Sequence, residues 1–130
     1  MRRGSTYEQK GDAEKTLADF ATALRLEPNN ANVQNAVAWI LATYPDPKYR
    51  NGQKAVSHAT KACELSSWKE PASIDTLAAT YAETGGFSDA VKWENKYLEF
   101  PLPAKAAETG RQRLALYQQS KSYHEEIQQN

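Results

Sequence analysis

Apolar side chains recur along this chain at intervals of three and four residues, the spacing of one face of an α-helix. Residues 13–26, AEKTLADFATALRL, show the pattern clearly, with Leu17, Phe20 and Leu24 on one face. The same spacing predicts further helices at residues 2–10, 31–43, 54–66, 71–84, 87–100 and about 104–122. No stretch alternates apolar and polar residues as a half-buried strand does. The pattern therefore predicts an all-α chain.

Residues that break helices separate these segments. Gly11 and Asp12 suit a tight turn followed by an N-cap, so we expect them to divide residues 2–10 from residues 13–26. Pro28 and the two asparagines after it suit the next turn. The helices are therefore expected to form three antiparallel pairs, followed by one terminal helix.

The three pairs align with one another at a regular interval. Tyr7 and Leu41 occupy matching positions 34 residues apart, and Leu41 and Tyr81 occupy matching positions 40 residues apart. The second pair has five extra residues in its inner turn, since Leu41 and Val56 are 15 residues apart and Tyr7 and Leu17 are 10 apart. A helix-turn-helix unit of about 34 residues is the period of the tetratricopeptide repeat (TPR). The first copy supplies the residues of that repeat's pattern at Gly4, Tyr7, Gly11, Asp12, Phe20, Ala23 and Pro28, and the third at Leu77, Ala78, Tyr81, Gly85, Phe87 and Ala90.

On these residues the chain resembles TPR proteins, in particular a subtype of bacterial multi-repeat proteins. It departs from the pattern at Thr16, at Glu94 and at Tyr97, where alanine, an aromatic and a small residue are usual. The resemblance implies one domain over 1–130, an α-solenoid of about three TPR pairs with a capping helix. The repeats are expected at about 1–30, 31–68 and 71–102, the capping helix at about 104–122 and a tail at 123–130. Because the first helix lacks the three residues that should precede Gly4, we expect that the chain is part of a longer repeat protein or that a partner or a second copy covers this end.

The resemblance also implies that the first helix of each pair lines a concave, peptide-binding surface. Its inward positions correspond to Ser5, Glu8 and Gln9 in the first copy, to Asn32, Asn35, Trp39 and Thr43 in the second, and to Ala72, Asp75, Ala79, Ala82 and Glu83 in the third. Among these, we expect peptide contacts from Asn32, Asn35, Trp39, Thr43, Asp75, Ala79 and Glu83. Asparagine amides can bind an extended backbone, and tryptophan is enriched at interface hot spots.

Each of these sites has a structural alternative. Trp39 can instead pack between helix pairs, and Asn35 and Asp75 can form local hydrogen bonds or face solvent. The long turn at 44–53 carries Tyr44, Lys48, Tyr49 and Arg50, which either bind a partner or brace the turn, with Tyr49 packing back. In the last helix, Arg113 is expected on a polar outer side.

Composition narrows the class of partner. The 130 residues are 40% apolar and carry 16 basic and 16 acidic side chains, without the basic excess of a nucleic-acid binder. No apolar run reaches membrane-spanning length, and the N-terminus lacks the apolar region of a signal peptide. A single cysteine excludes an internal disulfide, which together with the N-terminus favours the cytoplasm. Because Glu8, Asp75 and Glu83 would repel a carboxylate, we expect a neutral or basic segment rather than an acidic C-terminus as the ligand.

The sequence holds no catalytic, metal-binding or nucleotide-binding motif, so no enzyme activity or cofactor is expected. Cys63 is predicted to be buried, and His58 lies five residues from it, a poor spacing for a helical pair. His124 is expected to be solvated in the tail. The predicted function is a non-catalytic module that binds a protein or peptide. The alternative is a structural spacer or self-association module that uses the N-terminal face around Leu17, Phe20 and Leu24.

Overall fold

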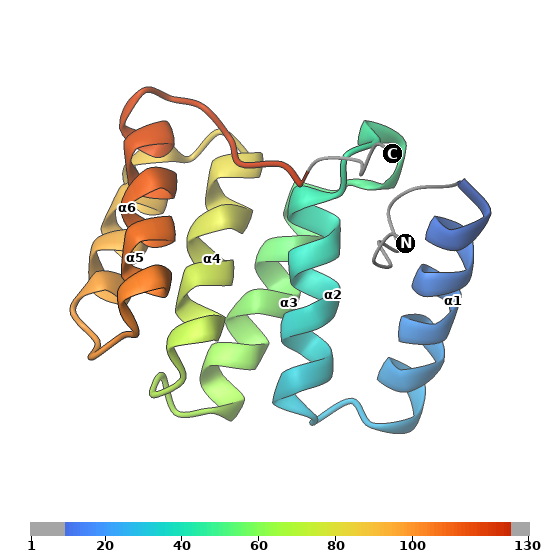
Figure 1. Cartoon of the computed structure of the whole chain (residues 1–130). Coiled ribbons are helices and arrows are strands. Elements are labelled where there is room, and N and C mark those ends of the chain that lie inside the picture. Colours follow the sequence, from blue (N-terminus) through green and yellow to red (C-terminus); the bar gives the residue numbers. More distant parts are fainter. Residues whose placement is uncertain (1–9, 126–130) are drawn as a thin grey trace.

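Six α-helices and one short 3₁₀ helix make up the part of the chain that the computed structural model describes, residues 10–125 (Figure 1). Their bounds are α1 Lys10–Leu26, α2 Ala31–Thr43, η1 Pro47–Tyr49, α3 Gly52–Leu65, α4 Pro71–Glu83, α5 Phe87–Leu98 and α6 Ala104–Gln118. None of the described residues forms a strand. The all-α prediction is therefore confirmed for this part of the chain.

Local signals in the sequence account for where several helices begin. The side chain of Asn30 accepts hydrogen bonds from the backbone N–H groups of Asn32 and Val33, which caps α2. Asn51 caps α3 in the same way through the N–H of Lys54. Pro71 occupies the first turn of α4, where its missing N–H costs no helical hydrogen bond.

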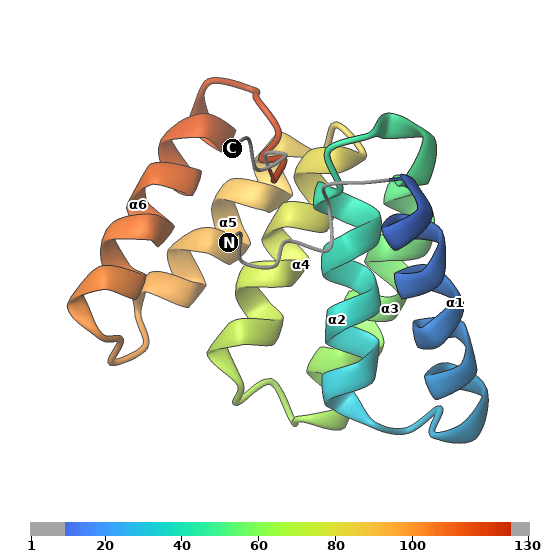
Figure 2. The same cartoon turned by 45° about the vertical axis from the view of Figure 1, so that its right-hand side comes forward.

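The helices stack on their neighbours in a repeated manner. α2 packs against α3 and α4, α4 packs against α5, and α5 packs against α6. In Figure 1, α2 and α4 lie toward the viewer and α3 lies behind them, an arrangement that Figure 2 also shows after rotation. This packing of adjacent helices is compatible with an α-solenoid.

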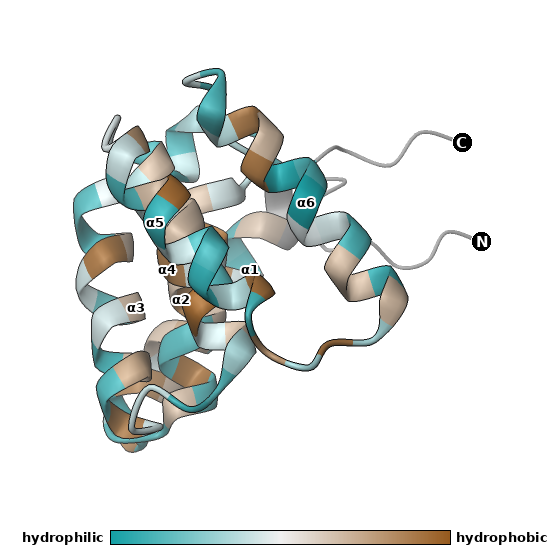
Figure 3. Cartoon of the chain, turned by 90° about the vertical axis from the view of Figure 1, so that its left-hand side faces the viewer, coloured by the Kyte–Doolittle hydropathy of each residue, from teal (hydrophilic) through white to brown (hydrophobic). Residues whose placement is uncertain are grey.

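Small side chains make this close stacking possible. Ala42 on α2, Ala55 on α3 and Ala79 on α4 are buried and meet in one cluster between the three helices. Larger buried side chains fill the remaining space, and burial of Leu77 stabilises the fold by roughly 1.5–3 kcal/mol. Cys63 is also fully buried, as predicted. Figure 3 shows hydrophobic segments gathered on α2 and α4 at the centre of the molecule.

The start of α1 differs from the sequence expectation. The described part of α1 already includes Lys10, so Gly11 and Asp12 lie within the helix and do not form a turn between two helices. Glycine lowers helix stability by only about 1 kcal/mol, and the packing of α1 on α2 through Ala13 offsets a cost of that size. The expected helix at 2–10, with Gly4, Tyr7 and the inward positions Ser5, Glu8 and Gln9, lies outside the described residues.

The long turn between α2 and α3 is braced from within. Tyr44 is buried, and the rings of Tyr44 and Tyr49 meet edge to face with centroids 5.3 Å apart. The Arg50 side chain donates hydrogen bonds to the backbone oxygens of Tyr44 at 2.6 Å and Pro45 at 3.1 Å. Of the two interpretations of this turn, the structure thus favours the one in which Tyr49 packs back.

Candidate functional site

A non-helical segment after α6 crosses the face formed by α4 and α2 (Figures 1 and 2). We call residues 122–125 the tail segment and the surface beneath it the α2–α4 face. Ser122 Oγ donates a hydrogen bond to the backbone oxygen of Ala82 at 3.0 Å. The backbone N–H of Glu125 donates to the backbone oxygen of Thr43 at 2.7 Å. The tail segment is therefore tied to the C-terminal ends of both helices.

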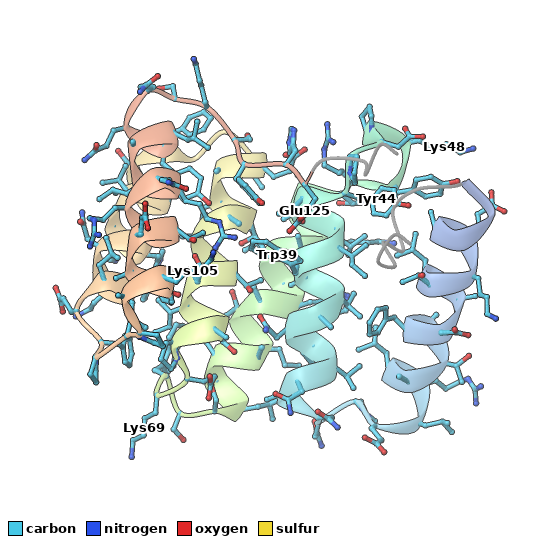
Figure 4. All side chains as sticks on the ribbon, in the orientation of Figure 1. Trp39, Tyr44, Lys48, Lys69, Lys105 and Glu125 are labelled. Atoms are coloured by element: carbon cyan, nitrogen blue, oxygen red, sulfur yellow. The ribbon has the colours of Figure 1, made fainter. Side chains whose placement is uncertain are left out.

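Trp39 is the main side chain of α2 beneath the tail segment. Its indole N–H donates to a carboxylate oxygen of Glu125 at 3.1 Å, and Figure 4 shows the two residues next to each other. The rings of Trp39 and Tyr123 lie 5.8 Å apart with a tilt of 35°. The Arg113 guanidinium from α6 lies 4.8 Å from the Trp39 ring and 4.6 Å from the Tyr123 ring. Three separate parts of the chain thus meet around one tryptophan.

An ion pair holds Arg113 in this position. One of its terminal nitrogens lies 2.7 Å from Asp75 Oδ2 on α4, and both side chains are nearly buried. Burial by itself would lower the pKa of Arg113, but the adjacent Asp75 carboxylate and the Tyr123 side chain raise it. The guanidinium is therefore charged, and a cation on the face of an aromatic ring is attracted to it. The expectation that Arg113 lies on a polar outer side is wrong, because its partner Asp75 draws it inward.

A buried carboxyl group lies beside this ion pair. Glu94 on α5 is fully buried, and its protonated carboxyl group can donate a hydrogen bond to the side chain of Asp75. Burial raises the pKa of Glu94 to about 10, and the neighbouring charge of Asp75 contributes to the rise. Glu94 therefore carries a proton at neutral pH, which avoids a second buried negative charge next to Asp75. Its departure from the repeat pattern thus has a structural consequence that the sequence did not reveal.

The other side of the tail segment rests on Glu83. His124 Nε2 lies 2.7 Å from Glu83 Oε1, and Arg50 Nε lies 3.1 Å from Glu83 Oε2. His124, expected to be solvated in the tail, is partly exposed but also contacts Glu83, because the chain folds back over α4 after α6. Glu83 is consequently held between a side chain of the long turn and one of the tail segment.

The residues expected to contact a peptide differ in what they offer. Trp39 and Asp75 are joined through Arg113, and Glu83 contacts the tail segment. The Thr43 side chain is buried and its hydroxyl donates to the backbone oxygen of Trp39, so only its carbonyl reaches the face. Of the remaining expected contacts, Ala79 is buried between helices and Asn32 is exposed. Asn35 is half-buried, and its buried Oδ1 atom has no hydrogen-bond partner among residues 10–125. Of the other inward positions, Ala72 is exposed and Ala82 is buried.

Sequence reasoning missed three residues of this site, Arg113, Tyr123 and Glu125. They belong to the terminal helix and the tail, which the repeat pattern treats as a cap. One signal was available, since aromatic and charged residues follow each other closely in KSYHE, residues 121–125.

A second hollow, about 490 Å³ in volume, lies where the α3–α4 turn meets the end of α5. Its lining is mostly apolar and consists of Trp68, Ile74, Trp93, Lys96, Glu99, Phe100 and Pro101. The rings of Trp68 and Trp93 stack at 5.4 Å, and Lys92 Nζ lies 4.9 Å from the Trp93 ring. Ligand sites usually combine an apolar lining with a few precisely placed polar groups. The two charged residues of this hollow, Lys96 and Glu99, are instead largely exposed.

Other kinds of site receive no support. Within residues 10–125, no group of three or more His, Cys, Asp or Glu side chains is arranged to hold a metal ion. No described helix is both long enough and apolar enough to cross a membrane. Comparison with protein-family models, with curated proteins and with solved structures finds no match to this chain. The assignment of a function therefore rests on the geometry of the α2–α4 face.

Proposed function

We propose that the chain is a non-catalytic TPR-type α-solenoid that binds a protein segment in a groove along the α2–α4 face. One observation carries the proposal: a non-helical stretch of polypeptide, residues 122–125, already lies on this face with both main-chain and side-chain contacts. A surface that accommodates four consecutive residues of its own chain has the shape and the hydrogen-bonding groups to accommodate those of another.

Helix termini supply the main-chain part of this recognition. The last four carbonyl groups of a helix have no partner within it. Thr43 is the last residue of α2 and Ala82 lies in the last turn of α4, and the carbonyl of each accepts a hydrogen bond from the tail segment. The Thr43 carbonyl thus accepts from the main chain of the tail segment, and the Ala82 carbonyl accepts from the hydroxyl of Ser122.

Trp39 supplies the side-chain part. Its ring offers apolar area, and its N–H must find an acceptor when it is covered. These groups suit an extended segment that brings both an aromatic or apolar side chain and a hydrogen-bond acceptor.

A peptide array probed with the purified chain tests this function. We expect a subset of peptides to bind, and Trp39→Ala to weaken their binding at least about tenfold, because tryptophans at interface centres often contribute more than 1.4 kcal/mol. Trp68→Ala is the matched control, since Trp68 is a half-exposed tryptophan of the second hollow. Equal binding by wild type and Trp39→Ala would refute the proposal.

Self-association through the N-terminal face remains the second candidate. α1 packs on α2 through Ala13, Leu17 and Phe20, while Leu26 at its end is 67% exposed. The expected contact residues Leu17 and Phe20 are thus partly covered within the chain, which leaves a smaller apolar surface for a second copy. Light scattering over a range of concentrations separates the two functions, since a constant monomer mass would exclude self-association.

A further inference from the structure

We infer that residues 122–125 are an internal competitor for the groove, and that its external ligand has the same chemistry: an aromatic residue followed two positions later by a carboxylate. The inference rests on the proposed function, because it assigns the ligand class and the regulation of the same α2–α4 face.

The contacts of the tail segment alternate between two helices. Ser122 and His124 contact α4, through the carbonyl of Ala82 and the carboxylate of Glu83. Tyr123 and Glu125 contact Trp39 on α2. Alternate side chains of an extended chain point to opposite sides, so a segment that runs between two helices presents every second residue to each. Each side of the groove therefore contacts residues two positions apart. The α2 side contacts Tyr123 and Glu125, which form a Tyr-x-Glu pattern.

The aromatic position is built before a ligand arrives. Arg113 is fixed by its 2.7 Å ion pair with Asp75, and its guanidinium faces the rings of both Trp39 and Tyr123. A guanidinium paired on its edge can still stack its flat face on a ring. An aromatic side chain is consequently favoured at this position over an aliphatic one of similar size.

The acidic position is defined by one donor and one acceptor of α2. The indole N–H of Trp39 donates a hydrogen bond to the Glu125 carboxylate. The backbone N–H of Glu125 donates a hydrogen bond to the Thr43 carbonyl. A hydrogen bond to an ionised acceptor is roughly twice as strong as one between neutral groups. A carboxylate two residues after the aromatic residue thus engages the tryptophan more firmly than a neutral side chain.

From the sequence we expected the acidic residues of this face to repel a carboxylate ligand. In the structure, the two that are described, Asp75 and Glu83, are each paired with an arginine. Asp75 is paired with Arg113, and Glu83 is paired with Arg50 at 3.1 Å. Each paired carboxylate repels an incoming negative charge less than a free one does. The expectation of a neutral or basic ligand rested on these two residues and on Glu8, which is outside the described part of the chain.

Covalent attachment makes the tail segment an effective competitor. A tethered segment meets its site at a high effective concentration. An external segment binds only the molecules whose groove is open, and its apparent affinity falls by that fraction. Loss of the tail contacts should therefore strengthen, and not weaken, binding of an external segment.

The experiment measures binding of a labelled peptide with the sequence of residues 119–125, QSKSYHE, blocked at both ends, to the full chain by fluorescence anisotropy. We expect the Tyr123→Ala/Glu125→Ala variant to bind this peptide at least about tenfold more tightly than wild type does, because its own tail competes poorly. Lys121→Ala is the matched control, since its side chain is exposed at the start of the same stretch, and should bind as wild type does. A peptide with alanine at both the tyrosine and the glutamate position should bind the double variant at least about tenfold more weakly.

Three results would overturn the inference: equal affinity of wild type and double variant, equal affinity for the two peptides, or tight binding by Lys121→Ala. If the double variant loses helicity, Glu125→Gln replaces it and is held to the same comparison. The proposed function is tested separately in the double variant. Array peptides whose binding depends on Trp39, without binding of QSKSYHE, would refute the ligand class alone, whereas binding unaffected by Trp39→Ala would refute the function.

Discussion

Replacement of Glu94 by glutamine is expected to stabilise this protein at neutral pH. In the folded chain the Glu94 carboxyl is fully buried, and burial together with the charge of Asp75 raises its pKa to about 10. In an unfolded chain a glutamate has a pKa of about 4.3 and is ionised at pH 7. Folding therefore takes up a proton at Glu94, and this uptake is unfavourable at neutral pH.

The size of the effect follows from the difference between the two pKa values. The stability contributed by a raised pKa is fully present below the unfolded value and is lost as pH rises toward the folded value. Across this window the free energy of unfolding falls by about 1.4 kcal/mol per pH unit, which amounts to about 4 kcal/mol by pH 7. Glutamine has nearly the shape of protonated glutamate and takes up no proton. Because its amide must also be buried, about 4 kcal/mol is the upper limit of the gain.

Urea unfolding followed by circular dichroism at several pH values measures this gain. The free energy of unfolding of Glu94→Gln should exceed that of wild type by a margin that grows about 1.4 kcal/mol per pH unit between about pH 5 and pH 8. Glu108→Gln, on the exposed side of α6, is the matched control and should stay within about 0.5 kcal/mol of wild type. A margin that does not change with pH would refute the reasoning, because it would mean that Glu94 is ionised in the folded chain.

Three further predictions concern packing and backbone geometry. A Cβ atom on Gly110 of α6 would lie 2.9 Å from side-chain atoms of Leu98 and Tyr97. Gly110→Ala should therefore lower the free energy of unfolding, measured with urea, by about 1–3 kcal/mol. An increase would contradict this packing. Ser67 has a φ of 56°, in the left-handed region, so Ser67→Gly should stabilise by up to about 1 kcal/mol in urea unfolding; clear destabilisation would contradict it. Cys63 is buried with a pKa raised by burial to about 12, so a thiol reagent should react at least about 100-fold more slowly with the native chain than with the urea-unfolded chain, and equal rates would contradict its burial.

Sequence rules predicted the helices well where a helix end depends only on residues within one turn of it. The ranges 31–43 and 71–84 agree with α2 and α4 to within one residue, because Asn30 and Pro71 act within one turn of the helix start. The interruption at Gly11 and Asp12 was predicted by the same kind of rule and was wrong. A weak helix former within a helix is tolerated or not according to what packs around it, which spacing along the chain does not specify.

The candidate site was predicted only in part. Trp39, Asp75 and Glu83 were identified because the TPR resemblance implies which positions of a first helix face inward. Their partners were not identified, because Arg113 is 38 positions from Asp75 and Glu125 is 86 positions from Trp39. No local pattern connects residues so far apart.

The sequence by itself determined that this chain is helical, where most helices begin and end, and which side of α2 and α4 carries polar and aromatic residues. These properties depend on interactions within one or two turns. The tertiary structure alone decided that α6 turns Arg113 toward Asp75 and that residues 122–125 return across the α2–α4 face. It also decided that Glu94 keeps its proton. The physical reason is that burial and charge neutralisation depend on which groups surround a side chain, and those groups come from helices that meet only when the chain is folded.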